Sequence, residues 1–226
     1  MEAVPRRGVL IVPWPVRRVV ATAGEFHHRD LPSGRVAWRV EIPAPVVVLG
    51  SRQDATMLNE RECIRQGLDV VRRRSGGGLV VLRPHEHVWV DLVIGRDDPL
   101  WDDDVTRSSW WLGKAWCDAI STLGVAGAVV HRDSLVADDW GQRICFAGVG
   151  PGEVVDADGR KVVGMAQRRA RGVARFQCTL YQRWSAREHE LLVANPPDGS
   201  VDGRVRCVER PADVVVDAFL TALDQY

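Results

Sequence analysis

The chain has 226 residues, which is enough for one domain with a substantial core. Its 30 basic and 30 acidic residues give a net charge of zero, so the composition does not favour nucleic acid or a membrane surface as a partner. No apolar run approaches the roughly 20 residues that cross a bilayer. The apolar stretch 8–16 is short and broken by prolines, unlike a signal peptide.

The cysteines favour a reducing compartment, and hence the cytoplasm. Their number is odd, and none has the CxxC spacing. That pattern fits neither a disulfide framework nor a zinc site. The histidines also lack a metal-binding spacing, so we expect no metal held by side chains.

Strand and helix patterns follow one another irregularly, after a weakly periodic lead-in over residues 1–30 that predicts a short strand at most. The strand patterns lie at 35–41, 45–49, 68–73, 79–83, 88–94, 127–131, 153–155, 161–167 and 173–181. The helical patterns lie at 54–66, 105–123, 186–193 and 212–223. Grouped strands with helices between them, and no strict βαβ alternation, predict an α+β fold with mixed or antiparallel sheets flanked by helices.

The most informative stretch is Val70–Val81, VVRRRSGGGLVV, in which three consecutive glycines stand between two strand patterns. Glycine within a sheet costs about 0.5–1 kcal/mol relative to alanine, so three together favour close approach of a ligand or another backbone. The arginines before them could bind a carboxylate or phosphate. The alternative is a plain glycine-rich turn. The spacing is neither that of a P-loop nor that of a dinucleotide-binding loop.

Lysine is rare in this chain, because arginine supplies almost all of the positive charge. The only lysines are Lys114 and Lys161. A lysine in so strong an arginine bias can be required as a compact, flexible point charge. Lys114 lies on the predicted helix 105–123 and is expected at the surface. Lys161 lies in a strand pattern close to Gly164, and is the better functional candidate.

A second stretch, Asp158–Arg169, has the sequence DGRKVVGMAQRR and follows Cys145-Phe146 and Glu153. Together with the glycine segment it resembles the biotin/lipoate protein ligase superfamily, in particular the lipoate–protein ligases and their octanoyltransferase relatives. The resemblance covers residues 46–181. The matching residues are Arg72, Arg73, Ser75, Gly76, Gly77, Gly78, Gly159, Arg160, Lys161, Gly164, Ala166, Gln167 and Arg169.

The resemblance implies a single α+β catalytic domain over residues 1–226, without the accessory C-terminal domain that many ligases carry. It implies that Lys161 is the reactive-centre lysine, which would stabilise charge at the carboxylate and phosphate of an acyl-adenylate. The glycines would let the acyl group lie against the backbone. The residues implied for substrate binding are Arg72, Ser75, Gly76, Gly77, Gly78, Leu79, Gly164, Ala166 and Gln167.

Three positions depart from the ligase pattern. His85-Glu86 follows the glycines where ligases have a His-Asp pair, and Gly152-Glu153 stands in place of Asn-Asp. Gln177-Cys178-Thr179 stands where ligases have His-Gly-Thr. The departure at Gly152-Glu153 concerns the magnesium and adenine contacts of the ligases.

Cys145 raises a second possibility. In the cofactor-free octanoyltransferases, a cysteine followed by Phe, and then by Glu before the GRK hairpin, carries the acyl group as a thioester. Cys145-Phe146 and Glu153 fit that pattern. A thiol acts this way only as an accessible thiolate, which a neighbouring Lys161 would favour. The alternative is that Cys145 is a small buried apolar residue.

Three functions therefore remain open. The first, which we favour, is a ligase that uses ATP and Mg²⁺ to activate a lipoyl- or octanoyl-type acid and transfers it to a lysine of a lipoyl-carrier domain or an H-protein-like acceptor. The second is a transferase that takes an octanoyl group from acyl carrier protein through Cys145 and needs no cofactor. The third is a non-catalytic binder of lipoate or biotin.

Overall fold

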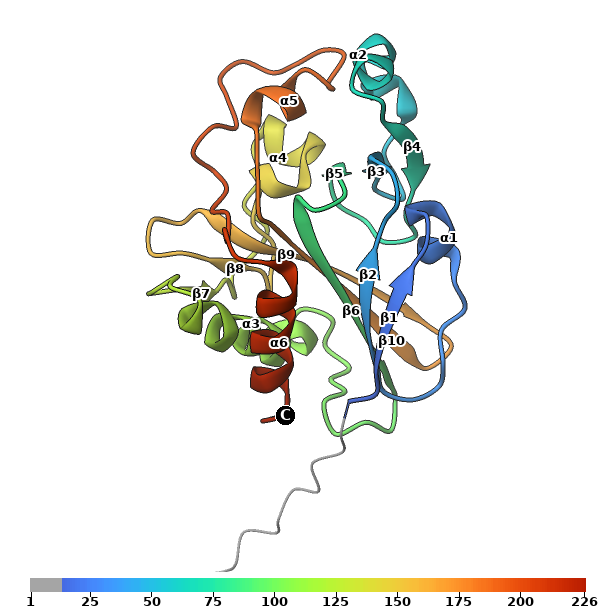
Figure 1. Ribbon diagram of the computed structural model, residues 1–226, viewed down its shortest axis with the longest axis vertical. Coiled ribbons are helices and arrows are strands. Elements are labelled where there is room, and N and C mark those ends of the chain that lie inside the picture. The colour runs from blue at the N-terminus through green and yellow to red at the C-terminus, as the bar shows by residue number, and fades with distance from the viewer. Residues whose placement is uncertain (1–13) are drawn as a thin grey trace, which may run out of the picture.

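The computed structural model describes residues 14–226, which build two β-sheets with helices around them (Figure 1). The strands are β1 Val16–Val20, β2 Val36–Glu41, β3 Val46–Leu49, β4 Asp69–Arg72, β5 Val80–Leu82, β6 His87–Gly95, β7 Val129–Val130, β8 Val154–Val155, β9 Lys161–Ala170 and β10 Val173–Tyr181. The α-helices are α1 Ala23–His28, α2 Glu60–Arg65, α3 Trp110–Thr122, α4 Asp139–Arg143, α5 Ala186–Glu190 and α6 Ala212–Leu223. Short 3₁₀ helices lie at Ala55–Met57 (η1), Arg107–Ser109 (η2) and Cys145–Ala147 (η3).

The larger sheet of the described chain has seven strands in the order β1-β2-β6-β10-β9-β8-β7. β1 and β2 are parallel, and every other neighbouring pair is antiparallel. The smaller sheet has the order β4-β3-β5, with β3 parallel to β4 and antiparallel to β5. The molecule is therefore α+β with mixed sheets flanked by helices.

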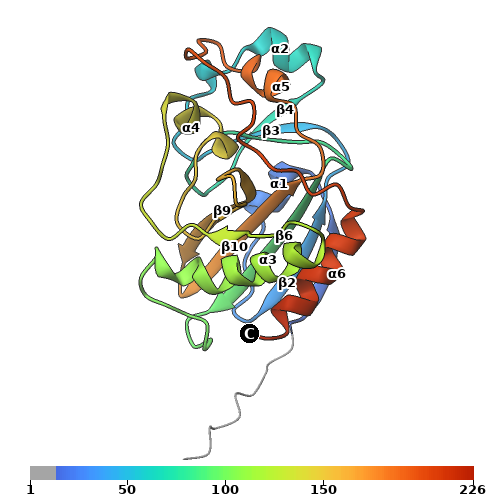
Figure 2. The ribbon, with the colours of Figure 1, turned by 90° about the vertical axis from the view of Figure 1, so that its left-hand side faces the viewer.

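One face of the larger sheet is covered by α3 and α6, which lie side by side in front of it in Figure 2. Alternate residues of β6 and β10 point to these helices, because successive side chains of a strand face opposite sides. Trp116 of α3 stacks on Phe219 of α6, with ring centroids 3.9 Å apart. This layer forms the main core.

The opposite face of the larger sheet packs against α1 and the smaller sheet. Phe26 of α1 contacts the indoles of Trp38 and Trp89 edge-on, and Val48 and Leu82 of the smaller sheet join the same cluster. The two sheets thus face each other across an apolar layer. The glycine segment between β4 and β5 lies at the margin of this layer.

Several predicted elements are confirmed closely, and others differ for local reasons. The strand at 173–181 and the helix at 212–223 have the predicted bounds. The predicted helix 54–66 is instead η1 followed by α2, because Asn59 caps a new helix through the amide of Glu62. The helix predicted from residue 105 begins at Trp110, after η2.

The lead-in contains more structure than expected. Helix α1 follows β1, and Thr22 and Glu25 form a capping box at its start. The prediction for the apolar stretch 8–16 falls mostly outside the described residues. None of the helices from residue 14 onward is long and apolar enough to cross a membrane.

Candidate functional site

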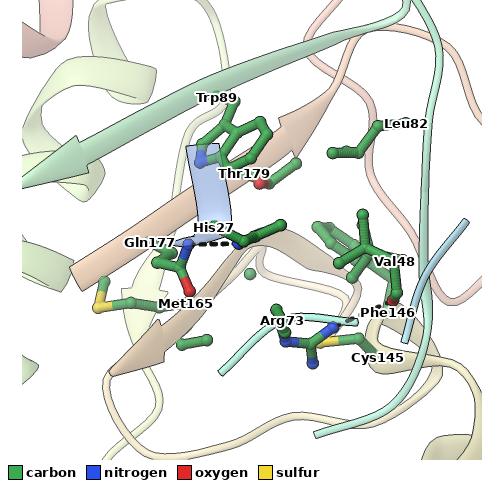
Figure 3. A pocket seen from close by; sticks show the side chains of 13 residues that line it. His27, Val48, Arg73, Leu82, Trp89, Cys145, Phe146, Met165, Gln177 and Thr179 are labelled. Carbon is green, nitrogen blue, oxygen red and sulfur yellow. Dashed lines mark hydrogen bonds between the residues drawn. The ribbon is translucent and has the colours of Figure 1, made fainter. Parts of the chain in front are cut away.

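Two adjoining hollows lie beside the glycine segment. The first is an open groove of about 630 Å³, lined by Gly76, Gly77 and Gly78 on one side and by Lys161 and Glu153 on the other. The second is a narrow, mainly apolar cavity between the two sheets (Figure 3). The residues that line both are Cys145, Met165 and Ala166. These three residues therefore mark the junction of the two hollows.

The glycine segment is held by Arg73, which is buried beside it. The Arg73 guanidinium donates hydrogen bonds to the carbonyls of Val48, Gly76 and Gly78, at 2.7–3.3 Å. Gly77 has φ of +95°, a conformation in which a side chain would be strained. A Cβ at Gly76 would meet nothing within 4 Å. Gly76 therefore has open space beside it, whereas Gly77 is required by the local turn.

Gly78 is a glycine for a different reason. A Cβ at this position would lie 2.6 Å from the backbone nitrogen of Cys145, so the loop of Cys145 occupies the space. The Leu79 amide donates to the Arg143 carbonyl (2.7 Å), and the Cys145 amide donates to the Leu79 carbonyl (2.9 Å). The glycine segment and the loop of Cys145 are thus joined as a short parallel bridge.

Lys161 begins β9 and is buried, with 1% of its side chain exposed. Its ammonium donates to the carbonyls of Cys145 (2.9 Å) and Gly148 (3.1 Å) and pairs with Glu153 Oε1 at 2.6 Å. These three oxygen atoms match the three N–H groups of an ammonium. The Cys145 sulfur lies 3.8 Å from the same nitrogen. The charge of Lys161 is therefore directed at its own loop and lies next to a thiol.

Glu153 completes this cluster as a buried carboxylate with several donors. Its Oε1 accepts from the Met165 amide (2.9 Å) as well as from Lys161, and its Oε2 accepts from the Gly150 amide (2.6 Å). Breaking a buried ion pair by removing one partner costs about 3–5 kcal/mol, so each member requires the other. The pair ties β9 to η3 and to the loop that follows it.

Phe146 packs between the cluster and the apolar cavity. Its ring centroid lies 4.9 Å from Lys161 Nζ and 4.6 Å from the ring of Tyr181. A Cβ at Gly164 would lie 2.8 Å from the Phe146 ring, so only glycine leaves room for it. Gly164 thus serves the placement of Phe146 while lining the cavity itself.

The floor of the apolar cavity is set by the register of β6, β10 and β9. Trp89, Thr179 and Gly164 are direct cross-strand neighbours in one row. Gln177 and Ala166 follow as neighbours in the next row. Beside β9, Ala166 has only a short side chain, and the Phe146 ring occupies the space next to Gly164. Val48, Val80 and Leu82 of the smaller sheet line the cavity from the other side.

A buried chain of polar groups runs along one wall of the cavity. The Ser75 hydroxyl donates to Gln177 Oε1 (3.0 Å), and Gln177 Nε2 is bonded to His27 Nδ1 (3.0 Å), as Figure 3 shows for the second pair. Gln177 Nε2 also lies 3.4 Å from Asp91 Oδ2, which pairs with Arg175 at 2.6 Å. Burial, followed by the charges of Arg175 and Arg73, lowers the pKa of His27 to about 3. His27 is therefore neutral at physiological pH.

The structure brings most of the residues named from the sequence to these two hollows. The residues that line one or both are Gly76, Gly77, Gly78, Cys145, Lys161, Gly164, Ala166 and Gln167. Ser75 reaches the cavity wall through Gln177. Leu79 is fully buried in the bridge to the Cys145 loop. Arg72 instead donates to the carbonyls of Gly50 and Gln53 in a neighbouring loop.

Sequence reasoning missed the structural roles of three important residues. Arg73 matched the motif, but nothing in the sequence shows that it clamps the glycine loop. Glu153 was noted for its spacing, without Lys161 as its partner. His27 carries no sequence signal, because α1 itself was not predicted.

Comparison with known proteins identifies the family. The model of the lipoyl protein ligase A/B catalytic domain matches residues 26–223, which is most of the chain. The chain belongs to this family. It is therefore an enzyme of the lipoate–protein ligase group within the biotin/lipoate ligase superfamily. A search of curated proteins gave no match.

Solved structures share the fold at low sequence identity. A lipoate-protein ligase A bound with ATP superposes with a TM-score of 0.74 at 16% identity, over 95% of this chain and 85% of the other. A bi-partite lipoate protein ligase from Thermoplasma acidophilum, studied with its E2 lipoyl domain, gives a TM-score of 0.72 at 16% identity over 94% and 83%. P. falciparum LipL1 in complex with lipoate gives 0.60 at 12% identity over 85% and 47%.

Proposed function

We propose that this enzyme transfers a lipoyl- or octanoyl-type acyl group to a lysine of a lipoyl-carrier domain, through a thioester on Cys145. The observation that carries the proposal is the position of Cys145. It lines both the apolar cavity and the open groove, and its sulfur lies 3.8 Å from the ammonium of Lys161. An acyl tail in the cavity would have its carbonyl carbon at the junction, within reach of the thiol.

The proposed reaction has two acyl transfers. The Cys145 thiolate attacks the thioester of an acylated carrier protein, and the carrier leaves as its own thiolate. The neutral amine of an acceptor lysine then attacks the Cys145 thioester. An amide forms, the bond from carbon to sulfur breaks, and a proton of the amine ends on the Cys145 sulfur. In the proposed reaction, the Lys161 ammonium would exchange one of its present oxygen partners for the carbonyl oxygen of the acyl group. It would thereby stabilise the negative charge that develops on that oxygen in each transfer.

The groove would receive the two protein partners in turn. Its open form suits the arm of a carrier or the side chain of an acceptor lysine. The Thermoplasma acidophilum relative was studied with an E2 lipoyl domain, which supports a lipoyl domain as the acceptor. An H-protein-like acceptor would present the same lysine chemistry.

A second candidate is the ATP-dependent ligase, supported by the ATP-bound relative and by the size of the groove. The charges of the groove fit a nucleotide triphosphate with Mg²⁺ poorly. Of the described residues that line it, three are charged, and Lys161 and Glu153 neutralise each other, which leaves Arg52. We therefore place the thioester route first.

The decisive experiment is to incubate the full chain with octanoyl-acyl carrier protein and no nucleotide. We expect intact mass spectrometry to show one acyl increment on the enzyme, which a lipoyl domain then removes. Cys145→Ala should show no increment. Acylation of the lipoyl domain by Cys145→Ala would overturn the thioester route. Pyrophosphate release that depends on lipoate, octanoate or biotin would support the ligase instead.

A further inference from the structure

One polar atom on the cavity wall lacks a partner. Among the described residues, nothing accepts a hydrogen bond from His27 Nε2, although His27 is only 5% exposed. The other buried side-chain atoms without partners belong mainly to indoles, and none of those residues lines the cavity. His27 is thus the described residue at which an unpaired buried polar group and the apolar cavity coincide.

The hydrogen-bond network fixes which His27 nitrogen carries the proton. Burial raises the pKa of Asp91, but the Arg175 guanidinium (2.6 Å) and the Trp89 indole (2.5 Å) both donate to it and favour the carboxylate. A carboxylate can only accept from Gln177. Gln177 therefore directs its NH₂ group toward both Asp91 and His27 Nδ1. Its oxygen accepts from Ser75 at the same time. His27 Nδ1 must be an acceptor, and a neutral imidazole then has its N–H at Nε2.

The imidazole is held in this position from several sides. Trp89 lies against it with ring centroids 4.9 Å apart, and Gln177 is bonded to Nδ1. In Figure 3 His27 lies in the middle of the view with Gln177 on one side. The low pKa of His27 keeps the ring neutral, so it presents a donor without a charge. A neutral donor supplies no counter-charge, so burying an anion in this apolar cavity would cost more free energy than burying an uncharged acceptor.

From this geometry we infer that the cavity selects an acyl group bearing a neutral hydrogen-bond acceptor, which receives a hydrogen bond from His27 Nε2. The substrate class is a medium-length acyl chain with an oxo, hydroxyl or comparable group in its tail, rather than a plain saturated chain. His27 is the specificity-determining residue. The inference depends on the proposed function only in taking this cavity as the acyl site.

The physical basis is the cost of leaving a buried donor unpaired. A plain alkyl chain in the cavity offers the Nε2 proton no acceptor, so the donor stays unpaired. A tail with an acceptor restores one hydrogen bond in a site of low polarity. An unsatisfied buried donor is costly enough that we expect about a tenfold or larger preference for the acceptor-bearing chain.

The test compares free acids as binding probes, so that it does not depend on turnover. Octanoate, its ω-hydroxy derivative and its (ω−1)-oxo derivative are titrated into the full chain carrying Cys145→Ala, by calorimetry. We expect at least one substituted acid to bind about tenfold more tightly than octanoate or better. Introducing His27→Phe into the Cys145→Ala chain keeps a ring at this position but removes the donor. The affinity of the substituted acid should then be close to that of octanoate. His27→Gln, which retains an amide N–H, should restore part of the preference.

A spectroscopic measurement covers the case in which a variant folds poorly. Nitrogen NMR of the unsubstituted chain should show His27 as the Nε2–H tautomer, with a shift of that signal on adding the preferred substituted acid and a much smaller one on adding octanoate. Equal affinities for all three acids, or a preference that survives His27→Phe in a folded variant, would overturn the inference and leave the acyl site standing. Failure of every acid to bind would overturn both.

Discussion

Two buried ion pairs in this molecule have the same chemistry and different surroundings. Lys161–Glu153 and Asp91–Arg175 are both almost fully buried, and each has a separation of 2.6 Å. The first borders the open groove and has a thiol 3.8 Å from its cation. The second lies on the larger sheet, enclosed by Trp89, Phe26 and Gln177.

The difference shows how position decides what a buried charge does. Both pairs cost free energy to desolvate, and neither is good evidence of stability by itself. In the proposed reaction, the cation at the groove would lie beside the atom on which negative charge develops. Beneath the cavity, the carboxylate instead orients Gln177, and through it His27. The first pair is therefore proposed to act on the reaction, and the second on the choice of acyl group.

The largest expected effect follows from removing Lys161. Lys161→Met should lower acyl loading of Cys145 by about 10²–10³-fold, as loss of an oxyanion-stabilising group does. It should also destabilise the fold by about 3–5 kcal/mol, because Glu153 is left as an unpaired buried carboxylate. Urea unfolding and acyl-enzyme mass spectrometry measure the two effects.

The double variant Lys161→Met/Glu153→Gln separates the effect on acyl loading from the effect on stability. It should regain most of the lost stability, because no uncompensated charge remains, without regaining acyl loading. If loading returned together with stability, the role of Lys161 would be structural only.

The second prediction concerns the enclosed pair. Arg175→Met should cost about 3–5 kcal/mol of unfolding free energy, since Asp91 then lacks its cation. Adding Asp91→Asn to the Arg175→Met variant should recover much of the lost unfolding free energy. Per folded molecule, acyl loading should fall far less than in Lys161→Met. A loss of loading as large as that of Lys161→Met, at equal folded fraction, would remove the distinction between the pairs.

Acid titration gives an intermediate effect. Burial lowers the pKa of His27 to about 3, and those of His87 and His189 to about 4, from 6.5. Because the folded values are depressed, the stability from keeping these rings neutral is fully present above pH 6.5. It is lost as pH falls from about 6.5 toward 4, by about 1.4 kcal/mol per pH unit for each ring.

Urea midpoints measured from pH 7.5 downward test this slope. His87→Gln keeps a donor for the Arg83 carbonyl, which His87 Nδ1 contacts at 2.8 Å, and has no imidazole to titrate. Its stability should therefore decline less steeply. A midpoint independent of pH between 6.5 and 4.5 would contradict the three buried neutral rings.

The smallest effect is expected at the other lysine. Lys114 is exposed and pairs with Asp118 one turn along α3, at 3.1 Å. Lys114→Ala should change stability by about 0.5 kcal/mol or less and leave acyl loading unchanged. A large effect on loading would show that Lys114 takes part in docking a partner.

Much of the fold was predictable where the sequence pattern is strong and local. β10 and α6 have long runs of apolar residues at the correct period, so their bounds were predicted well. Helix α1 has six residues and is defined mainly by its Thr22 capping box, a signal too short to stand out. The pairing of the strands depends on contacts between distant segments, which no local pattern contains.

The site shows the same division. The glycine segment and Lys161 were identified because their residue types are unusual for their positions. The Lys161 ammonium binds two carbonyls and Glu153. These contacts depend on the path of the loop between residues 145 and 153, which the sequence does not reveal. The role inferred for His27 depends on burial and on a tautomer set by Gln177, neither of which leaves a mark in the sequence.

The bridge between Leu79 and the Cys145 loop has a consequence for how the groove can open. Its two backbone hydrogen bonds, together with the absence of room for a side chain at Gly78, fasten the rim of the groove to the sulfur-bearing loop. If the rim swings outward to admit a bulky carrier, the thiol must travel with it. The distance between the groove rim and the Cys145 sulfur would therefore stay the same however far the rim moves.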